Sequence, residues 1–432
     1  MYIRKNNKMI ILLLLLTILV IATLLEFIAA NDNKNINDTE EKTQIVFLSS
    51  WGGSDTKASL MKEIIEDFEK ENKDIEVVDK SICNDEFLLT IKTDFAQGKE
   101  PDVFGLWPGS DIELLINADK VADLTGVLDE DEEWKDSFKE EAFQYDISDN
   151  KIYGLPFEII YECLFINKDI FEEYNVDIPK DYYDLVEAVK TFNDSDIIPI
   201  AYNATPEGTY LYQNIVMKLG GKYDVENPYY NGEIKSNYIE AMYYMKELYD
   251  LGAFPENAFT IDDKTRNDLF LNKKAAMIVQ GSWFIGEGGV NTNDDTVIII
   301  PFPTFNQGKS QSLSIIYGIG GGNFHMSQKA YEDKKKKEAC TRFMKYITSK
   351  EVALRFTNEL GCLTTIDIEK DEIDKSILLE QSMNLVDNAN ELVGPTDSFL
   401  NRTLWEDILV ERFPNVLEGN ESPEEVFKEM NQ

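Results

Sequence analysis

Histidine and cysteine are both scarce in this chain. A single histidine, His325, stands among 432 residues, which leaves little scope for His-based catalysis or for a metal site built from several histidines. The four cysteines lie far apart and none belongs to a C-x-x-C pair, so no zinc site is indicated. Cys340 and Cys362 are the nearer couple and could pair outside the cell, but buried free thiols suit a chain of this size at least as well. We expect no metal and no cofactor.

Basic side chains are also in short supply. There are 42 lysines and arginines against 80 acidic residues, which gives a formal net charge of −38. Nucleic acid is therefore a poor partner, because binding to phosphates depends on Lys and Arg, and a polyanionic ligand is disfavoured for the same reason. The acidic residues are spread along the chain rather than gathered in one tail, which indicates a solvated surface.

What the chain does contain is enough apolar material for large cores. Hydrophobic residues make up 43% and aromatic residues 11% of the sequence, which argues against global disorder. A length of 432 residues exceeds one ordinary domain, so two lobes are expected.

The first 30 residues form a membrane-targeting segment. Three basic residues precede an apolar run over 9–25, so the basic end stays in the cytoplasm and the rest of the chain lies outside. Only Ala30 supplies a small residue at the expected cleavage position, whereas the run nearly reaches the ~20 residues of a membrane span. Residues 1–30 are thus a signal peptide or an N-terminal anchor, with the uncleaved anchor favoured, and the polar stretch 31–44 is a linker.

The next segments indicate an α/β fold. A strand over 45–48 is followed by an amphipathic helix and by a second strand over 75–78, which is a β-α-β unit. Trp51 directly follows the first of these strands, and Trp107 follows a further strand over 102–106. Open α/β sheets bind ligands beyond the carboxyl ends of their strands, so both tryptophans are candidates for a cleft.

Trp283 occupies a similar position later in the chain. A short apolar run over 275–279 suits a buried strand, and Gln280, Gly281 and Ser282 end it with turn residues. The aromatic side chain that follows is well placed to face a crevice. The alternative is that Trp283 only covers the edge of a domain.

Several short motifs resemble one family. The segment 270–283 resembles F-x-x-G/N-K-A-A-M-x-x-x-G-x-W, with Lys273 at the G/N position, and 96–103 matches A-x-G-x-x-P-D-[VIL]. YGLP stands at 153–156 and is followed by INKD at 166–169, where the first residue is usually tyrosine. These motifs, in this order and spacing, resemble the family 1 extracellular solute-binding proteins of ABC transporters, which mostly bind sugars. The resemblance extends from about residue 45 to the end of the chain.

The resemblance implies an α/β fold of the periplasmic-binding-protein-like type II class. Its two lobes are built from discontinuous segments and are joined by a hinge, with the ligand cleft between them. In this sequence the solute-binding domain is expected over 45–432. The first lobe would comprise about 45–153 and 302–345, and the second about 154–301 and 346–432.

The resemblance also suggests the residues of the site. In the family a tryptophan at the position of Trp283 stacks on a sugar ring, and polar residues of the first crossing segment bind hydroxyl groups. Sugars present apolar CH faces to aromatic rings and hydroxyls to polar side chains. The candidate ligand-binding residues are Trp51, Trp107, Glu158, Tyr161, Trp283, Tyr317 and Trp405.

The expected function is that of an extracellular binding subunit of an ABC importer. It would capture a mono- or oligosaccharide, act as a monomer and deliver the sugar to permease subunits in the membrane. A sensor that passes its ligand to a membrane receptor and a binding protein for a polyamine remain open. An extracellular glycoside hydrolase needs two carboxylates flanking one bond, and no motif places such a pair, so we expect no enzyme activity.

Overall fold

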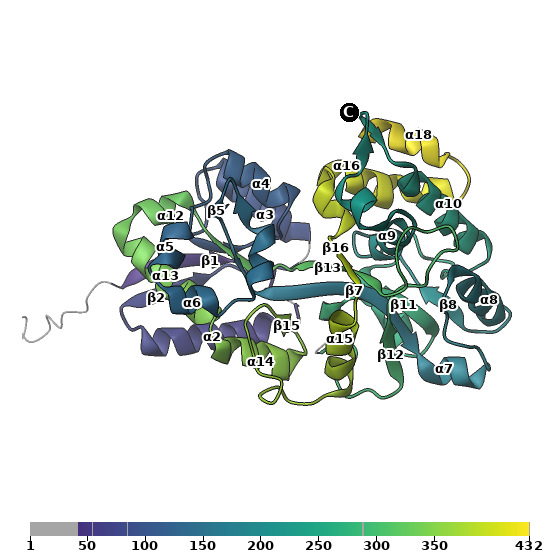
Figure 1. Cartoon of the computed structure of the whole chain (residues 1–432), viewed down its shortest axis with the longest axis horizontal. Helices are drawn as coiled ribbons and strands as arrows, with labels where there is room; N and C mark the ends of the chain where they lie inside the picture. Colours follow the sequence, from purple (N-terminus) through teal and green to yellow (C-terminus); the bar gives the residue numbers. More distant parts are fainter. Residues whose placement is uncertain (1–41, 54, 84, 287–288, 432) are drawn as a thin grey trace, which may run out of the picture.

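The structure is a computed structural model and is described for residues 42–53, 55–83, 85–286 and 289–431 (Figure 1). The predicted signal peptide or anchor and most of the predicted linker 31–44 lie outside this range. Within the described range, the first strand begins at Thr43, two residues before its expected start at 45. No helix in the described part of the chain is both long and apolar enough to cross a membrane.

One half of the molecule is built on a five-stranded sheet with the order β2-β1-β3-β14-β6. Its first three strands are parallel, whereas β14 is antiparallel to both of its neighbours. The strands of this sheet are β1 (Thr43–Leu48), β2 (Ile75–Asp79), β3 (Val103–Gly105), β6 (Leu155–Pro156) and β14 (Asn323–Met326). The predicted β-α-β start is present as β1, α2 and β2.

Both faces of this sheet are covered because successive side chains of each strand point to opposite sides. Phe47 joins the apolar core under α2, α13 and α14, whereas its neighbour Leu48 joins the separate core under α3. The stripe of α2 from Leu60 to Phe68 is buried at helical spacing. The helices of this half are α2 (Ala58–Glu71), α3 (Asp85–Ala96), α4 (Ser110–Asn117), α5 (Thr125–Asp129), α6 (Glu132–Asp136), α12 (Gln328–Glu332), α13 (Lys334–Ile347) and α14 (Lys350–Leu360).

The other half is built on a seven-stranded sheet around β7, which is the longest strand and is buried throughout (Figure 1). It contains the order β16-β13-β7-β11-β8, and β12 and β15 also pair with β7. Its strands are β7 (Glu158–Asn167), β8 (Ile198–Ala201), β11 (Ala275–Gly281), β12 (Val297–Ile300), β13 (Ser314–Ile319), β15 (Leu363–Thr364) and β16 (Glu391–Val393).

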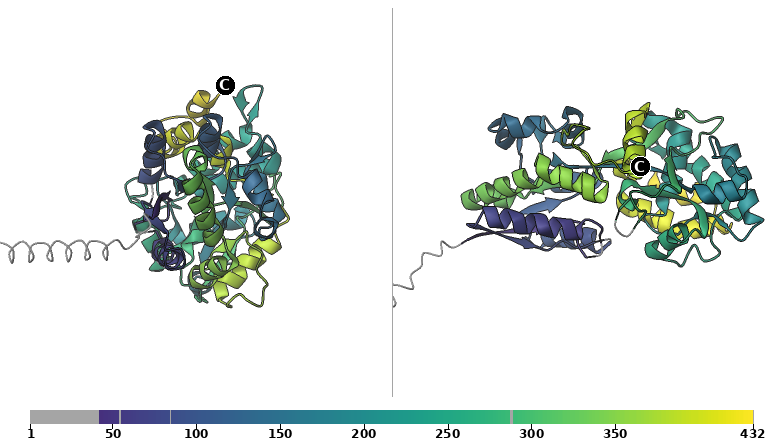
Figure 2. Two further views of the ribbon diagram at one scale, coloured as in Figure 1. Left: turned by 90° about the vertical axis from the view of Figure 1, so that its left-hand side faces the viewer. Right: turned by 90° about the horizontal axis from the view of Figure 1, so that it is seen from below.

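Two apolar cores also flank this second sheet. Leu164 and Ile166 of β7 pack on one side with α8, α9 and α10, whereas Cys163 and Phe165 pack on the other side with α15. The helices of this half are α7 (Lys168–Glu173), α8 (Tyr182–Asn193), α9 (Thr209–Glu226), α10 (Ser236–Asp250), α11 (Asp263–Leu271), α15 (Ile377–Asp387), α16 (Arg402–Glu406), α17 (Phe413–Leu417) and α18 (Pro423–Phe427). The two halves lie side by side along the long axis of the molecule (Figure 2).

The chain passes between the halves at three places, and two of them differ from the expectation. The first passage, from β6 to β7, falls close to the expected boundary at 153. The return to the first half was expected at 302, but Phe302 packs in the core of the second half and β13 pairs with β7. The actual return is the glycine-rich stretch 320–322 between β13 and β14.

The third passage comes later than the expected boundary at 345. Helix α14 and Ile366 pack in the first core, beside Phe157 and Phe343. The chain then leaves for α15, which packs on the second sheet. The apolar stripe of an amphipathic helix such as α14 does not show which of two cores the helix packs against. The prediction that α14 belongs to the second lobe was therefore wrong.

Candidate ligand-binding cleft

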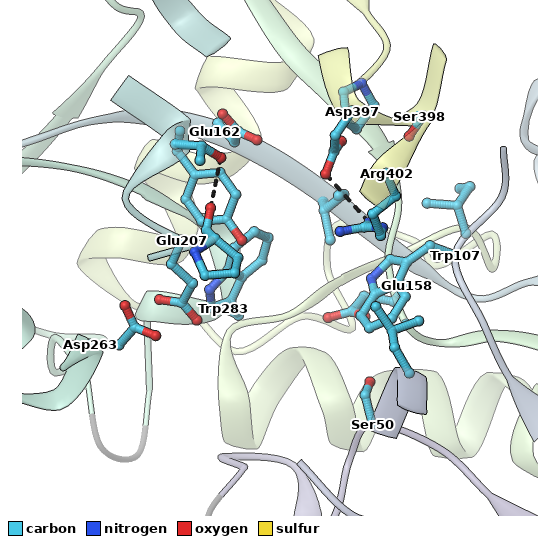
Figure 3. Close-up of a pocket in the computed structure, with 18 of the residues that line it drawn as sticks. Ser50, Trp107, Glu158, Glu162, Glu207, Asp263, Trp283, Asp397, Ser398 and Arg402 are labelled. Atoms are coloured by element: carbon cyan, nitrogen blue, oxygen red, sulfur yellow. Dashed lines mark hydrogen bonds and ion pairs between the residues drawn. The ribbon is translucent and has the colours of Figure 1, made fainter. Parts of the chain in front are cut away.

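A cavity of about 300 Å³ opens between the two halves and is lined from both of them. The first half contributes the segment after β1, including Ser50, and Trp107 after β3. The second half contributes one face of β7, Trp283 after β11, and Arg402 at the start of α16. Figure 3 shows these side chains converging on a common space. Pockets that hold small ligands begin at about this volume.

Trp283 lines the cavity at the end of β11. Its side chain is only partly buried, and its ring meets the ring of Tyr210 at 5.4 Å and 71°. The ring lies over the backbone of Gly281, where an added Cβ would be 2.1 Å from it. The turn after β11 therefore needs glycine so that the tryptophan can fold back toward the cavity.

Trp107 lines the opposite side of the cavity, after β3, and is also partly exposed. Its ring packs edge to face against Phe87 at 5.6 Å. The guanidinium of Arg402, from the other half, stands 5.8 Å from the ring centre. Trp107 is thus supported by Phe87 from its own half and lies close to a cation of the second half.

Trp51 and Trp405 reach the cavity lining but are almost completely buried, with exposed fractions of 2% and 1%. Trp51 is packed by Phe157, Phe324 and Phe356. A ring that is covered on its faces offers little area for stacking on a ligand. These two tryptophans support the wall of the cavity, whereas Trp107 and Trp283 expose aromatic surface to it.

Strand β7 presents Glu158, Ile160 and Glu162 to the cavity. Tyr161, which the sequence suggested as a ligand contact, lies on the opposite face of the sheet because side chains alternate along a strand. It is 1% exposed, and its hydroxyl donates a hydrogen bond to Ser382 Oγ at 2.5 Å. The prediction for Tyr161 is therefore wrong, and the residue that faces the cavity is its neighbour Glu162.

Tyr317 is not among the residues that line the cavity. In the antiparallel pairing of β13 with β7, Tyr317 stands directly opposite Tyr161, so both side chains are on the same face. Tyr317 is partly exposed and packs against the core under α15. This position gives no support to the prediction of a ligand contact at Tyr317.

Glu158 makes a buried ion pair in the lining. Its Oε1 lies 3.1 Å from Nζ of Lys57, and both side chains are almost fully buried. Burial alone lowers the pKa of Lys57, but attraction to Glu158 and Asp55 outweighs this effect and raises it above the usual range. Lys57 therefore stays charged, and much of its charge is neutralised by Glu158.

Glu162 forms no ion pair with a cation in the part of the chain that the structure describes. It is 2% exposed and accepts a hydrogen bond from Nδ2 of Asn214 at 2.9 Å. Burial, followed by repulsion from Asp397, raises the pKa of Glu162 well above its ordinary value. Asp397 itself pairs with Arg402 at 3.4 Å (Figure 3).

Two further acids enter the lining from the loop before α9 and from α11. Glu207 and Asp263 share one cation, Arg266, at 2.6 Å and 3.3 Å. Arg266 is 1% exposed and also donates to Oδ1 of Asn203. It lies behind the wall and holds both carboxylates in place from that side.

The sequence pointed to only part of this site. Glu162 could have been found from strand alternation once Glu158 was chosen, because residues two apart on a strand share a face. Glu207, Asp397 and Arg402 follow no motif that marks them. The cavity has the aromatic faces and polar groups that a sugar requires, and no cluster of metal-ligating side chains occurs within residues 42–431 where the structure describes them.

Two sheet-based halves, three chain passages and a polar and aromatic cavity between them define a two-lobed ligand-binding protein. Residues 52–354 match the family model for bacterial extracellular solute-binding proteins. This match covers well over half of the chain, so the protein belongs to that family. The family is one of extracellular binding proteins, and the predicted family and fold class are confirmed.

Three of the similar proteins have names or titles that refer to carbohydrates. A multiple sugar-binding protein of Streptococcus mutans is 26% identical over 343 residues, or 77% of each chain. A galactooligosaccharide-binding protein of Bacillus subtilis is 26% identical over 275 residues, or 60% of each chain. A solved structure concerned with xylan utilisation by Caldanaerobius polysaccharolyticus has a TM-score of 0.79 at 26% identity, covering 90% of this chain and 99% of the other.

Proposed function

We propose that this protein is the extracellular substrate-binding subunit of an ABC importer, and that it captures a mono- or oligosaccharide and delivers it to permease subunits. The observation that carries the proposal is the pair of partly exposed tryptophans, Trp107 and Trp283, which enter one interlobe cavity from opposite halves. The names of the similar proteins support a carbohydrate rather than another solute.

The chemistry of the lining suits a sugar. A pyranose ring has CH faces that pack on indole rings and hydroxyls that donate to carboxylates. Carboxylates such as Glu162 and Glu207 supply acceptors, and Ser50 supplies a hydroxyl. Rotation of the lobes about the passages near 157 and 320–322 would bring the two tryptophans together around the ligand, as in hinge closure.

The remaining features of the proposal come from the sequence. The protein acts at the outer face of the membrane, held there by an uncleaved N-terminal helix or released after cleavage, with the anchor favoured. It binds its ligand as a monomer, without catalysis and without nucleic acid. ATP is used by a separate subunit of the transporter.

A thermal-shift screen of the full chain against mono- and oligosaccharides tests the proposal. A ligand that binds only the folded state stabilises it by ~2.7 kcal/mol at a hundredfold excess over Kd. We expect one sugar class to raise the melting temperature and Trp283→Ala to abolish this shift. Amino acids, polyamines and ferric ion serve as controls, and a response to one of these with a silent sugar panel would overturn the assignment of a carbohydrate ligand.

A further inference from the structure

The cavity lining carries a large excess of negative charge. Among the described residues that line it, two side chains are cationic, Lys57 and Arg402. Its carboxylates are Asp55, Glu158, Glu162, Glu207, Asp263, Asp397 and Glu406. This excess is located at the cavity and is not only a reflection of the acidic surface of the protein.

The cations near the cavity are already shared among these acids. Lys57 pairs with Glu158. Arg402 pairs with three acids, namely Asp111 at 2.7 Å, Asp397 at 3.4 Å and Glu406 at 3.5 Å. Arg266 pairs with two acids. Among the described residues around the cavity, the cations are therefore fewer than the carboxylates, and not every carboxylate has a cation of its own.

Glu162 is the carboxylate with the least compensation. Within the described part of the chain its recorded polar contact is the amide of Asn214, and the charged group that acts on it is another acid, Asp397. Burying an ionised carboxylate without a cation costs free energy. Such a group is therefore either protonated or stabilised by a cation that binds beside it. Because Glu162 lines the cavity, a ligand is able to supply that cation.

Aromatic rings stand beside the same carboxylates. Tyr210 lies on the wall with Trp283, and the two rings meet at 5.4 Å. Desolvation of the Tyr210 hydroxyl, and then the charges of Glu207, Glu162 and Asp397, raise its pKa well above the ordinary value. Carboxylates next to aromatic faces form the environment that binds an ammonium group, through ion pairing and cation–π attraction.

We infer that the ligand is a carbohydrate that bears a protonated amine, with the ammonium group placed between Glu162, Asp397 and Tyr210 and a sugar face on Trp283. This inference rests on the proposed function and narrows its substrate class. A neutral sugar uses these carboxylates only as hydrogen-bond acceptors for its hydroxyls, whereas an ammonium group also gains the Coulomb attraction of their uncompensated charge. An amino sugar uses both the acceptors, through its hydroxyls, and the negative charge, through its ammonium group.

Matched sugars that differ only in the amine test the inference. Isothermal titration of the full chain at pH 6 would compare β-1,4-linked glucosamine oligomers with their N-acetylated and their amine-free counterparts, and the same comparison would be made for amino and neutral monosaccharides. We expect the amine form to bind at least about tenfold tighter, which corresponds to ~1.4 kcal/mol. Its affinity, and not that of the neutral sugars, should fall as salt is added.

Two variants test whether Glu162 causes the preference for amine-bearing sugars. In Glu162→Gln the affinity ratio of amine to neutral sugar should drop toward one, whereas the same change at Glu173, which is exposed on α7, should leave the ratio intact. Neutral sugars that bind as tightly as amino sugars would refute the inference and leave the proposed function standing. Failure of every sugar, charged or neutral, would refute both. Spermidine binding as tightly as the amino sugar would refute the carbohydrate part.

Discussion

Lys57 and Glu158 form a buried ion pair at the junction of the two lobes. Lys57 immediately precedes α2 of the first lobe, and Glu158 is the first residue of β7 in the second. Their charged atoms are 3.1 Å apart, and the second carboxylate oxygen of Glu158 accepts a hydrogen bond from the backbone of Gly322. One carboxylate therefore ties together the segment before α2 and two of the three chain passages.

Breaking this pair from one side should destabilise the protein strongly. Glu158→Gln leaves the ammonium of Lys57 buried with reduced compensation, which typically costs about 3–5 kcal/mol. Urea unfolding should show this loss, and the double variant Lys57→Met, Glu158→Gln should recover part of it because no buried charge remains. The exposed pair of Lys168 and Glu172 provides the control, since Glu172→Gln should change the free energy of unfolding by less than about 1 kcal/mol. An equally small effect at Glu158 would contradict the interpretation.

Trp283→Ala should reduce ligand affinity by more than about tenfold while the fold is retained. The ring is partly exposed and contacts the ligand space, so its loss removes apolar and aromatic contact area from the complex. Trp283→Phe should be weakened less, because an aromatic face remains. Titration calorimetry measures both, with Trp134→Phe as a control because Trp134 lies in the first core, away from the cavity. Unchanged affinity in Trp283→Ala would exclude the stacking role.

Tyr161→Phe should affect stability and leave affinity unchanged. The variant removes a buried hydrogen bond to Ser382 on the face of β7 that points away from the cavity. A loss of about 1 kcal/mol in the free energy of unfolding is expected. Glu162→Gln, at the next position of β7, should instead change the ligand affinity. Reduced sugar binding in Tyr161→Phe would mean that the cavity extends to the other face of the sheet.

Asp146 should make the stability of the protein depend on pH. Its carboxyl is buried, and burial raises its pKa from 3.8 to about 7 in spite of a hydrogen bond from Asn323. The folded state therefore binds more protons than the unfolded state between these values, so the free energy of unfolding falls as pH rises through this window. The total effect is on the order of 4 kcal/mol, since each pKa unit corresponds to about 1.4 kcal/mol.

Asp146→Asn removes this titration. Thermal unfolding should show the variant to be more stable than the parent at pH 8 and little different at pH 4. The same substitution at Asp149, which is exposed, serves as the control and should leave the pH profile unchanged. If the profile of Asp146→Asn matched that of the parent, the pKa of Asp146 would have to be the same in the folded and unfolded states.

Local patterns in the sequence predicted the elements that frame the cavity. The apolar run before Trp283 is β11, and the strand before Trp107 is β3. Each of these depends on neighbouring residues, through apolar runs and turn-forming glycines, so it can be recognised without knowing the rest of the fold. The family resemblance supplied the two-lobed architecture in the same way, from short motifs in a fixed order.

The sequence did not show which face of β7 lines the cavity. All ten of its residues are buried, so hydrophobicity does not distinguish one face from the other, and a shift of one residue exchanges them. Only the pairing of Tyr161 with Tyr317, and the packing of both beside α15, shows which face is turned away from the cavity. The two residues of β7 chosen from the sequence, Glu158 and Tyr161, therefore lie on opposite faces, and Glu162 on the face of Glu158 was missed.

The sequence by itself determined the family, the α/β class, the strand ends that carry Trp107 and Trp283, and the acidic character of the protein. The tertiary structure alone decided where the chain returns between the lobes and which acids meet in the cavity. Arg402 and Asp111 are 291 positions apart yet in contact, and Arg266 holds Glu207 from 59 positions away. Contacts at such separations arise from the packing of whole lobes, and no local pattern encodes them.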